Sequence, residues 1–582
     1  MLKNKLIILS LLISGTQFLF AQEKDKEKIT KDVKVVKEYT PSLSDAFKVN
    51  RMPVLHDSIS LNTEFKYNIL SKAMITGNEI EPITPARLGK ERKQPLKTSY
   101  FKAGVGNYNT FFGDLSFNVL QSERFVLGFD IGHWSSFGNL TLQNDEKVDA
   151  PFHDTWGKLG FDYLFLNKTL YTKIDFRHNI YDYYGYNNID PAAEYSLLNT
   201  PAPVTGDLLI PDTKQRLSGV DVTLGFKNNE LRDDRIIYDA RLGYLSFGNL
   251  TGVSQNGFNI GGNVYIPFGT VGFKVDLDIR YNNTSVPDSI GPLYSFNQRK
   301  NTLIGISPQM VFNFDVANIY VGLLMYGEAD TFDDEFQLAP ILKANLNIVE
   351  GVVSMEGGIK GHYDQNDYRT AQYENPFISP DKHVKTAFYG LDAFVSLKGN
   401  FSKSVSFAAD VSYSMFSNEH FYVNKFYLNN TDTVLQYTNL FAPVYDDGSL
   451  LTLSGELLYR PTDKFNVSTK ISYYGWKTDS LTRAWHKPEI EFMVNSRFSP
   501  IEDLWIDAGI NVLGKRYAFD PTEWSEVKLK AVFDLNIGAE YLYNSTWSFF
   551  ARINNLASSK YYQWYGYPMQ RLNLHVGVGI SF

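Results

Sequence analysis

The stretch FKVDLDIRYN at residues 273–282 alternates apolar and polar side chains without a break. Its odd-numbered residues are Phe, Val, Leu, Ile and Tyr, and its even-numbered residues are Lys, Asp, Asp, Arg and Asn. In a β-strand, residues i and i+2 lie on the same face, so this stretch has one apolar face and one polar face. The pattern recurs in LKAVFDLNIGAEY at residues 529–541 and in LNLHVGVGISF at residues 572–582. The period of two predicts a protein built largely from β-strands.

Two architectures could use such strands: a membrane barrel, and a secreted β-sandwich or propeller. From residue 99 to residue 582, about 22 segments of this kind follow one another, with tight turns alternating with longer loops. The polar faces are rich in charge and glycine, as expected of a wet lumen, and Tyr541, Tyr543 and Trp547 are spaced like an aromatic girdle. We therefore predict an outer-membrane antiparallel β-barrel of about 22 strands, and merging doubtful neighbours would give about 16 to 20.

Composition excludes several other classes of protein. The chain has 582 residues and a mean hydropathy of -0.24, and beyond its first 21 residues it contains no apolar run long enough for a transmembrane helix. A formal net charge of -8 argues against a nucleic-acid partner, because proteins that bind nucleic acids normally carry a strongly basic face. The absence of cysteine excludes disulfides, thiolate metal sites, cysteine nucleophiles and a lipidated N-terminal cysteine.

The front of the chain differs from the rest. Residues 1–21 carry Lys3 and Lys5, continue with a short apolar run and end on Ala21, which matches a Sec signal peptide cleaved before Gln22. A retained anchor is the alternative, but polar residues interrupt the run and leave it shorter than the ~20 residues of a span. Residues 22–97 contain spaced prolines and predict an extended periplasmic segment. The barrel then occupies residues 98–582.

The C-terminal region resembles that of TonB-dependent receptors of outer membranes. The resemblance is carried by Asn555-Leu556, Lys560-Tyr561-Tyr562, Gly566-Tyr567-Pro568 and the terminal Phe582. The Ala-Gln junction and the loops rich in Tyr and Asn are similar to members from the Bacteroidota. The resemblance implies an exported barrel that contacts outer-membrane lipid, and Phe582 is expected to be the signal that the barrel-assembly machinery reads.

The N-terminal segment departs from the same family. Its members carry a folded plug domain, and residues 22–97 are too short and too rich in proline to form one. A run of β-prone residues in this segment resembles a TonB box, which pairs with an edge strand of TonB. It consists of Asp32, Val33, Lys34, Val35 and Val36. The alternative is an extended segment that lies on the barrel rim or on another protein.

We find no pattern that predicts an enzyme. The nine histidines are scattered singly, and neither an H-E-x-x-H motif nor a G-x-S-x-G elbow occurs. We therefore assign no catalytic, cofactor or metal-binding residues. Acidic runs such as residues 330–335 are interpreted as solvated loop charge, with loop-stiffening or lipopolysaccharide-bridging calcium as the alternative.

Aromatic residues in two long loops are the candidate binding residues, because exposed rings stack on sugars or pack against protein partners. Packing of the loops on one another over the barrel mouth is an equal alternative. The candidates are Tyr183, Tyr184, Tyr186, Tyr562, Trp564 and Tyr565.

The sequence leaves three functions open. The first is receptor-type nutrient uptake, with TonB or a surface lipoprotein as partner. The second is an accessory or structural barrel of a larger assembly or secretion complex in the outer membrane, and the third is a passive pore.

Overall fold

The structure of the protein is a computed structural model that describes residues 99–121, 124–189, 195–196, 203–204, 213–228, 236–286, 298–331, 333–380, 382, 384–429 and 434–582. The chain consists of two units, residues 1–82 and 83–582, and every described residue belongs to the second. The predicted signal peptide (residues 1–21), the extended segment (22–97) and the run that resembles a TonB box (32–36) lie outside the described residues.

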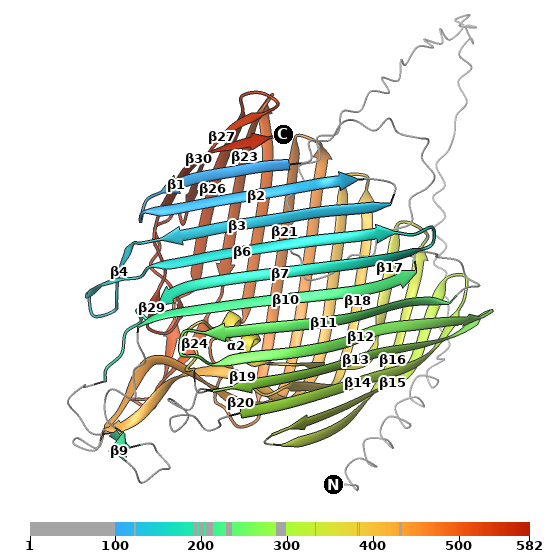
Figure 1. The fold of residues 1–582 in the computed structure, drawn as a ribbon, viewed down its shortest axis with the longest axis horizontal. Coiled ribbons are helices and arrows are strands. Elements are labelled where there is room, and N and C mark those ends of the chain that lie inside the picture. The colour runs from blue at the N-terminus through green and yellow to red at the C-terminus, as the bar shows by residue number, and fades with distance from the viewer. Residues whose placement is uncertain are drawn as a thin grey trace, which may run out of the picture. The chain divides into compact units, whose positions relative to one another are not determined.

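The described residues form a closed ring of 22 antiparallel strands, as the sequence predicted (Figure 1). Each strand pairs with its neighbour in chain order, and the last strand, β30, pairs with the first, β1. The ring strands are β1 (Ser99–Gly106), β2 (Thr110–Gln121), β3 (Phe125–Ser136), β6 (Phe152–Leu164), β7 (Lys168–Asp182), β10 (Lys214–Asn228), β11 (Ile237–Asn249), β12 (Ser254–Phe268), β13 (Val271–Ser285), β14 (Gln298–Asn313), β15 (Ala317–Asp330), β16 (Asp334–Val349), β17 (Val353–Asp364), β18 (Ala387–Ser402), β19 (Val405–Asn429), β20 (Val434–Thr462), β21 (Phe465–Thr478), β22 (Ile490–Ile501), β23 (Leu504–Leu513), β26 (Val532–Leu542), β27 (Trp547–Asn554) and β30 (Asn573–Ser581).

Short strands and a helix lie in the connections at one end of the ring. The paired strands among them are β4 (Asn139–Thr141) with β5 (Lys147–Asp149), β24 (Arg516–Asp520) with β25 (Ser525–Leu529), β28 (Tyr562–Trp564) with β29 (Tyr567–Pro568), and β8 (Tyr195–Ser196) with β9 (Pro203–Val204) and with β19. The helix α2 (Tyr368–Glu374) begins with a capping box, in which Asp367 accepts the Thr370 amide and Thr370 accepts the Asp367 amide. Among the described helices, none combines the length and the apolar character needed to cross a bilayer.

Strand β13 shows how the alternating sequence becomes two different surfaces. Phe273 points outward and is 40% exposed. On the inner face, Lys274 Nζ lies 3.0 Å from Asp276 and an Arg280 guanidinium nitrogen lies 2.8 Å from Asp278. The outer face of the ring is thus apolar, whereas the lumen wall is charged and hydrogen-bonded.

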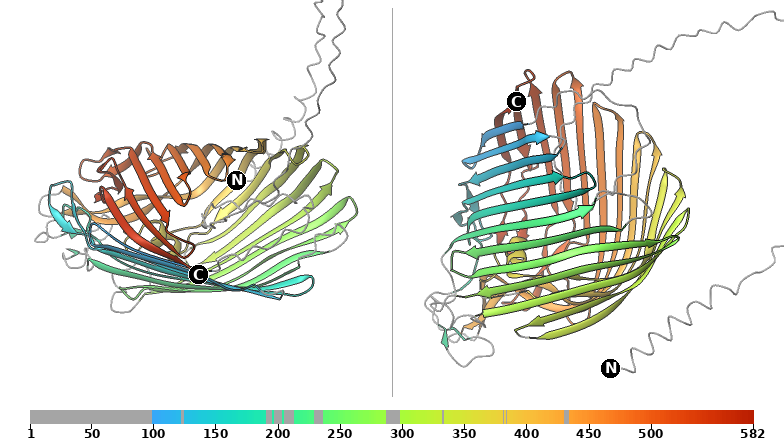
Figure 2. Two further views of the ribbon diagram at one scale, coloured as in Figure 1. Left: turned by 90° about the horizontal axis from the view of Figure 1, so that it is seen from above. Right: turned by 45° about the vertical axis from the view of Figure 1, so that its right-hand side comes forward.

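Exposed apolar side chains occur on strands all around the ring, whose closed course Figure 2 shows from two further sides. An exposed apolar surface of this extent is incompatible with a monomer in water and suits contact with lipid chains. Large side chains on it that are at least 40% exposed include Val105, Phe111, Ile131, Leu242, Phe258, Ile260, Ile304, Met310, Leu323, Leu338, Leu342, Val395, Val411, Leu453, Ile471, Phe549 and Val576.

The two ends of the ring differ in the length of their connections. At one end, tight turns such as residues 165–167 and 403–404 join the strands, and both termini of the ring meet there. The Phe582 amide donates to the Ser99 carbonyl (3.0 Å), and the Ser99 amide donates to the Phe582 carbonyl (3.2 Å). The other end carries the long connections, and we call it the mouth. In outer-membrane barrels the tight turns are periplasmic and the long loops are extracellular.

One strand prediction was wrong in its boundary. The alternation over residues 529–541 predicted a single strand, but β25 ends at Leu529 and β26 begins at Val532. Leu529 pairs with Arg516 in a separate hairpin, whereas Val532 pairs with Leu513 in the ring. Residues 530–531 are the corner between the two sheets, and the local alternation carries no sign of it.

The assignment of outer and inner faces can be tested by introducing a charge on each face of one strand. We expect Ile260→Arg, on the outer face of β12, to destabilise the membrane-inserted barrel by about 2–4 kcal/mol, because the guanidinium would lie in hydrocarbon. Asn263→Arg is the matched control on the inner face of the same strand, where it faces Asp239 and Asp276 in register and should be tolerated. Urea unfolding in lipid vesicles, followed by heat-modifiable gel mobility, measures both. Equal losses of stability in the two variants would contradict the assignment of faces.

Candidate functional site

The connection between β17 and β18, residues 365–386, folds into the mouth and is called the mouth loop below. On one side it contacts the inner wall of β7, β10 and β11. The Arg369 guanidinium pairs with Asp221 on β10, and the Tyr181 hydroxyl of β7 donates to the Pro376 carbonyl (2.6 Å). Asn249 of β11 donates to the Tyr368 hydroxyl (2.8 Å).

On its other side the mouth loop is tied to β19. Glu374 Oε2 lies 2.6 Å from His420 Nε2 and accepts the Tyr422 hydroxyl at 3.0 Å. Because β11 to β18 lie between β10 and β19 in the ring, a loop that contacts both strands crosses the mouth (Figure 1).

Glu374 remains a carboxylate over most of the pH range. Burial acts to raise its pKa, but the hydrogen bond and charge of His420, the charge of Lys487 and the Tyr422 hydroxyl outweigh burial and lower the pKa to about 2. The anchor at the C-terminal end of α2 is therefore ionic at neutral pH.

An aromatic cluster joins the mouth loop to the loops around it. The Tyr567 ring, which is 1% exposed, stacks on Phe377 of the mouth loop with 3.5 Å between centroids. Tyr184 contacts the same Tyr567 ring edge-on at 5.0 Å, and fully buried Phe441 of β20 lies 6.2 Å from it. The Tyr567 hydroxyl donates to the Asn439 carbonyl (2.8 Å), so the buried polar atom is satisfied.

The structure brings the predicted loop aromatics together in and around this cluster. Each contacts protein groups of a strand or of another loop at the mouth, and ligand binding by these residues stays a prediction. Tyr183 packs beside Tyr181, Tyr184 beside Phe377, Tyr186 beside Tyr437, Trp564 beside Tyr422, Tyr565 beside Tyr437, and the Tyr562 carbonyl accepts Arg516.

His486, which the sequence did not single out, joins three segments of this end. It is buried in the loop of residues 479–489, and its Nδ1 lies 2.9 Å from the Tyr422 carbonyl of β19. Its Nε2 accepts the Tyr565 amide at 3.3 Å. Burial lowers the pKa of His486 to about 3, so the ring is neutral, with its proton on Nδ1.

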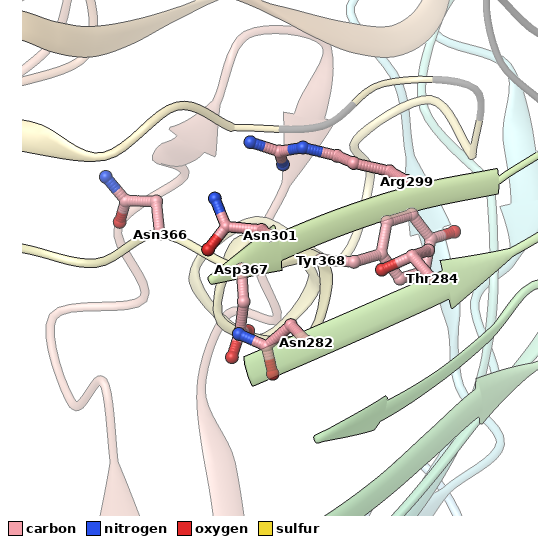
Figure 3. A pocket seen from close by; sticks show the side chains of 7 residues that line it. All are labelled: Asn282, Thr284, Arg299, Asn301, Asn366, Asp367 and Tyr368. Atoms are coloured by element: carbon pink, nitrogen blue, oxygen red, sulfur yellow. The ribbon is translucent and has the colours of Figure 1, made fainter. Parts of the chain in front are cut away.

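A polar pocket separates the mouth loop from the wall of β13 and β14 (Figure 3). The loop contributes Asn366, Asp367 and Tyr368, and the wall contributes Asn282, Thr284, Arg299 and Asn301. A second pocket adjoins it and shares Arg299. It is lined as well by Glu328, Asp330, Asp333, Glu335, Lys385 and Thr386.

The contacts across these pockets are few and polar. Arg299 lies 2.6 Å from Asp330 on the wall, and it reaches the mouth loop through the Val384 carbonyl at 3.4 Å. The Thr386 hydroxyl donates to Glu328 at 3.0 Å. Toward β7 and β20 the mouth loop is held by ring contacts in addition to polar ones, whereas its contacts toward β13 to β15 are hydrogen bonds.

The acidic runs have structural partners. Asp446 of β20 accepts the amides of Ser480 (2.9 Å) and Leu481 (2.7 Å), which fixes the start of the loop that carries His486. Asn418 donates to Glu335 at 3.1 Å. Among the residues that the structure describes, no group of three or more His, Asp or Glu side chains is arranged to hold a metal ion.

Several solved structures share this architecture. The FrpB iron transporter from Neisseria meningitidis superposes with a TM-score of 0.60 at 10% identity, covering 83% of this chain and 81% of that one. The pyoverdine outer membrane receptor FpvA from Pseudomonas aeruginosa superposes at 0.59 with 10% identity, covering 84% and 80%. This chain has the fold of these transport proteins.

A third example extends the likeness. The ferric-catecholate import receptor Fiu from E. coli K12, in its closed form, gives a TM-score of 0.56 at 11% identity and covers 84% of this chain and 82% of that one. No family model and no curated protein matches the sequence. At 10–11% identity the likeness is one of fold alone.

Because of His486, we predict that the loops at the mouth open more readily at low pH. The pKa of His486 is about 3 in the folded chain and lies below the ordinary value of 6.5. Between these two pH values, His486 binds a proton when the loops are open but not when they are closed. The closed form therefore loses stability relative to the open form as the pH drops from 6.5 toward 3. We expect the free energy of opening the loops at 479–489 and 555–572 to fall by up to about 1.4 kcal/mol per unit of pH decrease in that window. Hydrogen exchange of these loops, corrected for intrinsic rates, measures the slope. In His486→Gln the slope should be smaller, and an unchanged slope would assign the effect to other groups.

Proposed function

We propose that this protein is an outer-membrane barrel similar to TonB-dependent receptors, which takes up a nutrient through its lumen. The observation that carries the proposal is the mouth loop, which crosses the long-loop end of a wide ring and is anchored on both sides. The likeness to the FrpB iron transporter and the FpvA receptor supports the same function.

The lumen suits a polar or charged solute. Lys102 lies 2.8 Å from Glu540, and Arg497 lies 3.7 Å from Asp507, all on inward-facing positions of the wall. A ring of about 22 strands encloses a wide lumen, which in membranes is normally obstructed. A loop across the mouth reduces leakage while leaving a polar route beneath it.

Recognition is proposed to begin at the polar pockets beside the mouth loop. Their lining offers amide, hydroxyl, carboxylate and guanidinium groups, and the hydrogen bonds that cross them could be exchanged for bonds to a solute. The aromatic side is harder to separate, because opening it would expose buried rings to water. The loop would therefore open by swinging away from β13 to β15 about its aromatic side.

Energised opening is proposed to come from TonB, acting on residues 32–36. A surface lipoprotein is a second proposed partner, and the Bacteroidota type, the export signal and the missing plug remain predictions of the sequence. Other subunits of an outer-membrane complex would be expected instead if the protein is an accessory barrel. We also propose that it is not an enzyme.

Whether the mouth loop closes the lumen can be tested with a single introduced thiol, because the chain contains no cysteine. We expect Asn259→Cys, on the lumen side of β12, to react slowly with a bulky impermeant maleimide added to whole cells. Replacing residues 366–385 by a short Gly-Ser linker should make the reaction much faster, because the mouth is then open. Replacing residues 140–148 of the β4–β5 hairpin is the control for losing a loop. Fast labelling with the mouth loop intact would instead favour a passive pore.

The energy source has its own test. Deleting residues 30–38 should abolish energised uptake and any growth that depends on it, while the protein still reaches the outer membrane. A chain with Asp32 to Val36 in scrambled order controls for segment length. If every TonB-dependent growth phenotype survived the deletion, the uptake proposal would be wrong. Stoichiometric co-purification with assembly or secretion components would then indicate an accessory barrel.

A further inference from the structure

Three of the nine histidines lie together on the outer face of the ring, close to the mouth. They are His133 on β3, His153 on β6 and His178 on β7. Their neighbours Asp154 and Arg177 point inward, where they pair at 2.9 Å, so the histidines of the same strands point outward.

The strand register places these rings beside two cations of β10. His133, Thr155, His178 and Ser218 form one row across the four strands. Ser135, His153, Ile180 and Arg216 form the next row toward the mouth. Neighbouring strands are about 4.8 Å apart, so His153 and Arg216 lie about 10 Å from each other.

The second cation, Lys214, stands beyond Arg216 on the same face of β10, and both side chains are exposed. Asp182 is the register partner of Lys214 and offsets part of its charge. No ion pair among the described residues includes Lys214 or Arg216. The outer face here carries more positive than negative charge.

Two of the histidines are oriented by hydroxyl groups of the neighbouring strand. His133 Nδ1 lies 2.7 Å from Thr155 Oγ1, and His178 Nδ1 lies 2.8 Å from Ser218 Oγ. When the hydroxyl donates to Nδ1, the ring proton is on Nε2, which is then a donor toward the surroundings of the barrel.

On the side of this group that faces the tight-turn end, the outer surface of the ring becomes apolar. Ile131 is 47% exposed and Phe176 is 41% exposed, each two residues along its strand from a histidine. Phe137, on the mouth side, contacts His153 edge-on at 4.9 Å and is 51% exposed. The polar group therefore lies at the level where lipid chains give way to headgroups.

We propose that the surface formed by His133, His153, His178, Lys214 and Arg216, here called the rim patch, binds the phosphorylated headgroup of an outer-leaflet lipid. The two cations attract the phosphate, the imidazole Nε2 groups donate to its oxygens, and the acyl chains lie on the apolar surface below. This inference rests on the placement in the outer membrane that the proposed function makes.

The test is native mass spectrometry of the full-length protein in mild detergent, titrated with diphosphorylated lipid A. We expect the double variant Lys214→Gln with Arg216→Gln to weaken lipid A binding about tenfold, because each cation near the headgroup contributes to binding. The matched control is Lys300→Gln, which removes an exposed lysine at the mouth end of β14, outside the rim patch. It should bind as the unaltered protein does.

The headgroup is tested separately from the lipid chains. Lipid A without its phosphates should bind weakly to every variant, and millimolar inorganic phosphate should not compete with the phosphorylated form. Equal binding by the double variant and Lys300→Gln, or equal binding of the two forms of lipid A, would overturn the proposal. Effective competition by inorganic phosphate would also overturn it, in favour of a free-anion site.

The same samples separate this inference from the proposed function. Outer-membrane fractionation and heat-modifiable mobility report whether each variant is inserted and folded. If the unaltered protein is absent from the outer membrane, the proposed function fails. If every variant is inserted and lipid A binding does not change, only the rim patch is wrong.

Discussion

The requirement that every backbone amide and carbonyl finds a partner governs the whole structure. In hydrocarbon an open sheet edge has no water to bind, so the sheet must close on itself. Closure occurs where Tyr100 to Gly106 of β1 pair with Ser581 to His575 of β30. With antiparallel pairing this demands an even number of strands, which brings Ser99 and Phe582 to the same end. The tight turns accumulate at that end, and the opposite end is free to carry loops that fold over the lumen.

The fold could be predicted because its signal is local. A period of two assigns a face to each residue of FKVDLDIRYN without reference to the rest of the chain, and Phe273 and Asp276 lie on the expected sides. Counting repeats of that signal gave the 22 strands. Local signals fail where two sheets meet. Residues 529–532 continue the alternation through a corner, and the 25- and 29-residue strands β19 and β20 continue beyond the ring through two shifts of register.

The site could be predicted only in part, because its contacts join residues that are far apart in the chain. The candidate aromatics were recognisable as ring-rich loops, but Tyr184 meets Phe377 and Trp564 meets Tyr422 only after the barrel has closed. The pairing of Arg369 with Asp221 spans 148 residues and decides where the mouth loop lies. His486 is a lone histidine in a polar loop, and nothing in the sequence distinguishes it from the other eight.

The two sides of the mouth loop are held by contacts of different kinds. Its ring contacts, such as Phe377 on Tyr567, exclude water, so their loss would expose apolar area at about 25 cal/mol per Å². Its polar contacts, such as Thr386 to Glu328, exchange with water or solute at small net change, since a protein hydrogen bond contributes about 1 kcal/mol. The two sides therefore differ in what can replace them. In the opening that we propose, a polar solute competes with the side facing β13 to β15 and leaves the aromatic side intact, so the aromatic side is the hinge.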